Sequence, residues 1–170
     1  MPPEWARGDD AWIKDVMAPA MSAAMAAWHQ SYLPMHFQAG AAEKYNYKPR
    51  TRKYWIQKMR YANKHNPEAR NPLTYTGLMK AMTQMGIAVT VKSAGRSGHR
   101  QITSVKGVMQ APRYVHMFSK GATLKGGNHP YLAGEATAVT QGEMDYLFKI
   151  IEDKITTAMN RNTQTSVVTV

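Results

Sequence analysis

The sequence predicts an α+β fold, in which a small antiparallel sheet packs with a long N-terminal helix, short basic helices and a long C-terminal helix. Two observations indicate the helices: apolar residues recur every three or four positions over residues 10–38 and again over 140–160. A third indicates the sheet, because residues 87–91 alternate apolar and polar side chains with the period of a strand.

The order helix, basic helix, helix, strands, helix contains neither an internal repeat nor an interdomain linker. We therefore expect a single domain over residues 1–170, with residues 1–9 and 161–170 as extended arms.

The first predicted helix spans residues 10–38. Asp9 or Asp10 can cap its start, kinks or restarts are expected near Pro19 and Pro34, and Gly40 is a plausible stop. Its apolar stripe is rich in methionine, and we interpret it as core packing, with an adaptable binding face as the alternative. The stripe consists of Ile13, Met17, Met21, Met25, Trp28 and Tyr32.

Two short helices are predicted next. Thr51 can cap a basic helix over 52–63, and a loop marked by two Asn-Pro pairs follows over 66–72. Thr74 or Thr76 can cap a second helix over 77–84, which Gly86 ends.

Strands occupy the region after this helix. The first covers 87–91, a hairpin loop covers 93–99, and the return strand runs through 101–108. A third strand is expected over 113–118, before a glycine-rich loop over 121–130 that we expect to be mobile.

The last helix begins with Thr140 and Glu143 at capping-box spacing, and its helical pattern stops after Asn160. The tail over 161–170 ends in a short run that favours β structure. It is either a free terminus or an arm that adds a strand to another subunit.

Charge is strongly segregated along the chain. There are 22 Lys and Arg against 11 Asp and Glu, a net charge of +11. Residues 44–133 carry a net +16, whereas 1–43 carry −3 and 134–170 carry −2. This pattern indicates an acidic partner: nucleic acid, an acidic protein surface, or the acidic ends of a neighbouring copy. A solvated basic face without a partner is the simpler alternative.

Signals of enzymatic chemistry are weak. The sequence has no cysteine, no HExxH motif and no GxSxG elbow, and its glycine clusters do not match a phosphate-binding loop. No apolar run is long enough for a transmembrane helix. We expect no catalytic, cofactor-binding or metal site, no enzymatic activity and no membrane association.

Basic and aromatic residues interleave across 44–64, which offers both phosphate neutralisation and stacking surfaces. This segment favours a small basic DNA-binding protein, although contact with a protein surface explains it equally well. The candidate partner or DNA contacts are Lys48, Arg50, Arg52, Lys53 and Arg60.

Several motifs in order resemble the head–tail joining proteins of tailed bacteriophages, the neck or tail-completion group. They are HFQAGAAEKYNYKPR over 36–50 with Tyr54 after it, NPLTYTGL over 71–78, PRYVHMF over 112–118, and the closing helix over 135–158 after HPYL at 129–132. The resemblance covers about residues 30–160.

This resemblance implies a structural virion protein at the head–tail junction, made in the host cytoplasm, without catalysis or cofactor. Such proteins form homo-oligomeric rings between portal or connector proteins and tail proteins, close to packaged DNA. The candidate subunit-interface residues are Arg113, Tyr114, Val167, Val168 and Val170.

Overall fold

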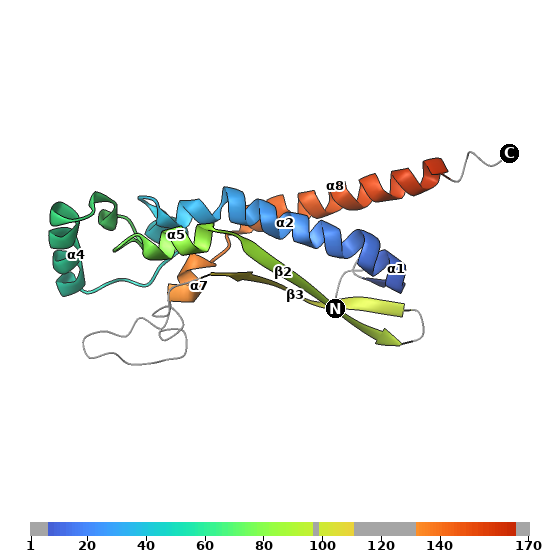
Figure 1. Ribbon diagram of the computed structural model, residues 1–170, viewed down its shortest axis with the longest axis horizontal. Coiled ribbons are helices and arrows are strands. Elements are labelled where there is room, and N and C mark those ends of the chain that lie inside the picture. The colour runs from blue at the N-terminus through green and yellow to red at the C-terminus, as the bar shows by residue number, and fades with distance from the viewer. Residues whose placement is uncertain (1–6, 97–98, 111–131, 166–170) are drawn as a thin grey trace. The chain divides into compact units, whose positions relative to one another are not determined.

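The computed structural model describes residues 7–96, 99–110 and 132–165 (Figure 1). It confirms the α+β class: helices precede and follow a short antiparallel sheet. Contacts divide the chain into two compact units, of which unit 1 comprises residues 1–28, 88–108 and 141–170, and unit 2 comprises 29–87 and 109–140. The single domain over 1–170 stays a prediction.

The N-terminal helix begins where the sequence predicts and then changes its winding. The Asp9 carboxylate accepts a hydrogen bond from the Trp12 amide at 2.7 Å, which confirms it as the cap of α1 (Asp10–Trp12). A π-helical turn, Ile13–Met17, leads into α2 (Ala18–Ser31). Pro19 lacks an N–H and crowds the preceding turn, and the wider π turn lies where that strain is expected.

The first helix is shorter than predicted. It ends at Ser31. A separate 3₁₀ helix, Leu33–Phe37, follows, with Pro34 in its first turn. Gly40 does not simply stop a helix: at φ +82° it is the N-cap of α3 (Ala41–Lys44), an element the sequence did not indicate. A left-handed backbone is cheap for glycine, so the chain can turn there.

The core of unit 1 lies between α2 and α8 (Gln141–Thr165), which lie side by side in Figure 1. Ala20 and Ala24, one helical turn apart, are buried against Ile151. Their small side chains allow the two helices to approach closely. Larger residues close the cluster: Met21, Leu147, Ile150 and Ile155.

The methionine-rich stripe is confirmed as core packing at Ile13, Met17 and Trp28, all of which are buried. The helical pattern of α8 continues beyond Asn160 to Thr165.

The sheet is longer than predicted. Strands β2 (Ile87–Arg96) and β3 (His99–Met109) form a hairpin, and β1 (Arg7–Gly8) pairs antiparallel with β3, giving the order β1-β3-β2. The hairpin loop predicted over 93–99 was therefore wrong, since most of it is strand. Cross-strand bonding, such as Thr103 Oγ1 donating to the Lys92 carbonyl at 3.2 Å, overrides the low strand propensity of Ser and Gly. The predicted strand 113–118 and loop 121–130 lie outside the described residues.

Unit 2 consists of short helices. Thr51 is confirmed as the cap of α4 (Arg52–Lys64), because its Oγ1 accepts from the Tyr54 amide. The loop predicted over 66–72 contains a 3₁₀ helix, Pro67–Arg70. The N-cap of α5 (Leu78–Gln84) is Gly77 at φ +85°, and neither threonine takes that position. Unit 2 also contains α7 (Leu132–Ala136).

In the part of the chain that the structure describes, no helix has the length and apolar character needed to cross a membrane.

Candidate functional site

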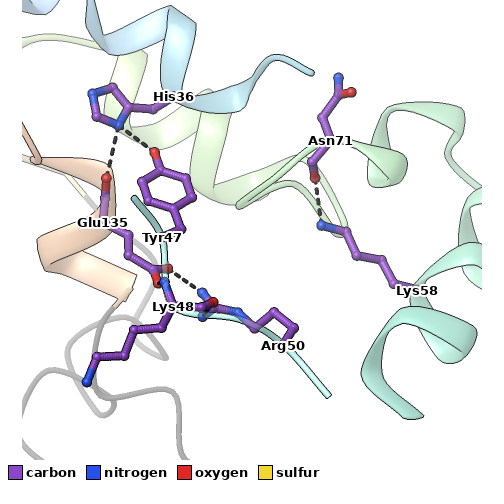
Figure 2. A network of polar contacts seen from close by, with 7 residues as sticks. All are labelled: His36, Tyr47, Lys48, Arg50, Lys58, Asn71 and Glu135. Atoms are coloured by element: carbon purple, nitrogen blue, oxygen red, sulfur yellow. Dashed lines mark hydrogen bonds and ion pairs between the residues drawn. The ribbon is translucent and has the colours of Figure 1, made fainter. Parts of the chain in front are cut away.

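A buried ion pair connects α7 to the segment that precedes α4 (Figure 2). Glu135, 7% exposed, pairs through Oε2 with Nη2 of Arg50, which is 15% exposed. Its Oε1 accepts the Lys48 amide at 3.1 Å, and Nη1 of Arg50 donates to the Lys48 carbonyl at 2.7 Å. One carboxylate therefore binds both the backbone amide of Lys48 and the side chain of Arg50.

A histidine ring on the preceding 3₁₀ helix joins the same network. Nδ1 of the fully buried His36 lies 2.9 Å from the Glu135 carbonyl oxygen and 2.6 Å from the Tyr47 hydroxyl. Because a carbonyl oxygen only accepts, Nδ1 carries the proton and the Tyr47 oxygen accepts as well. The ring also stacks on Tyr45, with centroids 3.7 Å apart. These contacts hold residues 36–47 against α7.

Lys58 on α4 is a buried cation, with only 1% of its surface exposed. Its Nζ donates to the Asn71 carbonyl at 2.6 Å and lies 5.3 Å from the Trp55 ring centroid and 5.6 Å from that of Tyr54. Burial, with a smaller contribution from the nearby Arg50 charge, lowers the Lys58 pKa to about 8. Lys58 remains mostly protonated at pH 7.

These residues border a pocket of about 180 Å³. Its walls come from residues 47–50, the first two turns of α4 and residues 72–73, together with Ala42. Among the residues that the structure describes, three basic side chains line it, those of Lys48, Arg50 and Lys58, and no acidic side chain does. The remaining lining residues are aromatic, proline or aliphatic. An anionic group with an apolar body fits this chemistry best.

The structure brings two of the five predicted contact residues to this pocket, Lys48 and Arg50. Arg52, Lys53 and Arg60 are instead exposed along α4 and do not line it. Arg50 is not free to contact a partner through all its donors, because Glu135 and the Lys48 carbonyl engage it. The candidate interface residues lie outside the described residues: Arg113, Tyr114, Val167, Val168 and Val170.

Sequence reasoning missed the central residues Lys58 and Glu135. Helical spacing places Lys58 on one face of α4 with Tyr54 and Ala62, the side that is least exposed. That pattern could have distinguished Lys58 from the other basic residues of the helix. No local signal identifies Glu135, because its partners lie more than 80 positions away.

Within residues 7–96, 99–110 and 132–165, no group of three His, Asp or Glu side chains is arranged to hold a metal ion. Comparison of the chain with protein-family models, curated proteins and solved structures finds no match.

Proposed function

We propose that this protein is a structural virion protein of the phage neck, which joins the portal connector to the tail by assembling as a ring around the DNA channel. The motif resemblance suggests this role. The structural observation that carries it is a row of exposed apolar side chains along α8, a surface suited to contact with another protein chain.

The row follows one face of α8, with successive members four and eleven residues apart. Met144, Phe148 and Met159 are between 37% and 54% exposed. Phe148 also borders a groove of about 150 Å³ with Ile151 and Ile155. Single exposed apolar residues are common on monomers, but several of them on one face of a helix favour an interface.

Ion pairs within the chain change the expected role of charge in assembly. Asp10 pairs with Arg100 at 2.5 Å, and Glu135 pairs with Arg50. Both pairs join an acidic end to the basic middle of the same molecule, so these charges are already compensated. We therefore expect the α8 row to supply most of the affinity between copies, with exposed charges contributing little.

The residues of the first resemblance motif have a structural explanation in unit 2. His36, Tyr45, Tyr47 and Arg50 all belong to the network around Glu135. Their spacing reflects packing within unit 2, so the motif does not by itself identify a contact surface.

The test places a charge in the apolar row. Phe148→Asp should abolish ring formation, measured by light scattering coupled to size exclusion and by negative-stain microscopy with connector and tail proteins present. Thr157→Asp adds the same charge to an exposed site on the opposite face of α8 and should leave assembly intact. A folded Phe148→Asp variant that enters particles as well as the wild type would contradict the proposal.

DNA binding through residues 44–64 is the second candidate. It is favoured by exposed Lys53, Arg60 and Lys64, which helical spacing places on one side of α4. The affinity for duplex DNA should then fall steeply as the salt concentration rises. In a plot of log affinity against log salt concentration, each phosphate contact contributes a slope of roughly −0.9. Substituting Lys53, Arg60 and Lys64 by Ala should remove most of that slope. A shallow slope in the wild type would exclude this role.

A further inference from the structure

The pocket beside α4 contains a buried ammonium group whose hydrogen-bonding capacity is only partly used. The Lys58 Nζ has three donors, and its contacts among the described residues include one acceptor, the Asn71 carbonyl. The faces of Tyr54 and Trp55 provide favourable cation–π contacts, but an aromatic face carries no charge.

The described residues of the pocket also provide no counter-ion for this lysine. The Glu135 carboxylate bonds to two residues that line the pocket. Its oxygens accept from the Arg50 guanidinium and the Lys48 amide, and neither bond involves Lys58. Within the described part of the chain, Lys58 forms no ion pair. Burial of an uncompensated ammonium is costly, so an anion that enters the pocket would relieve that cost.

The dimensions and walls restrict what that anion can be. A volume of about 180 Å³ accommodates one short side chain or a small organic acid, and it lies below the range typical of larger ligands. Pro49, Pro72 and Leu73 provide apolar surface for a short hydrocarbon stem.

We propose that the pocket binds a single carboxylate group, with the Lys58 ammonium as its counter-ion and the rings of Tyr54 and Trp55 beside its hydrocarbon stem. The carboxylate comes either from an acidic side chain of another protein chain or from a small organic acid. Charge balance favours a monovalent group, because Arg50 is already neutralised and Lys48 is exposed, which leaves Lys58 as the one buried positive charge to be balanced among the described lining residues. A doubly charged phosphate would leave a second charge buried without a partner.

The test follows Lys58 directly. In protein labelled with ¹³C-lysine, the Cε resonance of Lys58 is identified by its loss in Lys58→Arg, and its pKa is measured without ligand and with acetate. An anion held by the ammonium stabilises the charged form, so acetate should raise the pKa above about 8. Acetamide, which has the same shape and no charge, should leave the titration unchanged.

Variants provide an independent readout. Acetate should raise the thermal midpoint of the wild type by mass action, and Lys58→Met should weaken its binding about tenfold or more. Lys80→Met, at an exposed ion pair far from the pocket lining, should bind acetate like the wild type. If Lys58→Met does not fold, the comparison of acetate with acetamide on the wild type still tests the proposal.

The source of the carboxylate is distinguished by a glutamate that is acetylated at its N-terminus and amidated at its C-terminus. Tighter binding than acetate indicates an acidic side chain, and weaker binding indicates a small organic acid.

The proposal is overturned if acetate and acetamide act alike, if Lys58→Met responds to acetate as the wild type does, or if inorganic phosphate at equal ionic strength has the same effect as acetate. None of these results depends on ring assembly.

Discussion

Arg50 and Glu135 form an ion pair across 85 positions of sequence, and the two residues connect the segment before α4 to α7. The carboxylate also accepts the Lys48 amide, so it is the common partner of two groups in unit 2. Two backbone segments of unit 2 thus depend on one side chain for their attachment.

Glu135→Gln should therefore destabilise the protein. The substitution leaves the Arg50 guanidinium largely buried without a counter-ion, and we expect a loss of about 3 kcal/mol in the free energy of unfolding. Urea denaturation measures it. The matched control is Glu68→Gln, which breaks the exposed pair between Glu68 and Lys80 and should cost less than about 1 kcal/mol. Equal losses in the two variants would contradict the burial argument.

The stability contributed by Lys58 should rise with pH. Its pKa is about 8 in the folded protein against the ordinary 10.5, so between these values the unfolded chain binds the proton more tightly. Unfolding then takes up protons, and the free energy of unfolding increases as pH rises from 8 towards 10.5. Below pH 8 the full cost of the buried charge is present.

Lys58→Met and Lys58→Arg both remove this titration. The wild type should gain stability relative to each variant between pH 7 and 9.5, measured by urea denaturation at several pH values. The measurements stop at pH 9.5 because Tyr54 begins to contribute above that pH. Burial raises the Tyr54 pKa from 10, so its ionisation lowers the free energy of unfolding as pH rises further. At pH 7, Lys58→Met should be at least as stable as the wild type, because it removes an uncompensated buried charge. Parallel pH curves for all three proteins would refute this assignment.

Trp28 should be more sensitive to substitution than Trp55. The indole Nε1 of Trp28 donates to the carboxylate of Glu143 at 3.3 Å, and both side chains are buried in unit 1. Trp28→Phe removes this donor and leaves unfilled volume, so we expect a loss of about 2 kcal/mol in the free energy of unfolding. Trp55→Phe, at a side chain 37% exposed, should change it by no more than about 0.5 kcal/mol. Similar losses at both positions would contradict the assignment.

Two glycines should respond to alanine with opposite signs. Gly77 has φ +85°, and a Cβ there would come no closer than 3.9 Å to its nearest neighbour, Asn66 Nδ2. Gly77→Ala therefore creates no clash and should lose about 1–2 kcal/mol through backbone strain alone. Gly142, in the first turn of α8, has open space around it, and Gly142→Ala should gain about 0.5 kcal/mol. Thermal unfolding of the two variants measures both changes, and a loss at Gly142 would show that helix propensity is not the controlling factor there.

Local patterns were sufficient for much of the fold. Asp9 and Thr51 cap the helices they were expected to cap, because a side chain and an amide two or three residues later are enough to define that contact. The α2 and α8 stripes were likewise predictable from helical period alone. The α+β class follows from the order of these local signals.

Tertiary contacts decided the rest. Gly95 lies in a strand because cross-strand bonding overrides its low strand propensity. Basic composition predicted an acidic partner, but it could not tell Arg50, which is paired within the chain, from Lys58, which is buried without a carboxylate. That distinction depends on where Glu135 and Asn71 come to lie after folding. The periodic patterns of the sequence therefore predicted the long helices, the sheet and the segregation of charge. Which charges are compensated was established by tertiary contacts, because pairing and desolvation are set by distances between residues far apart in the chain.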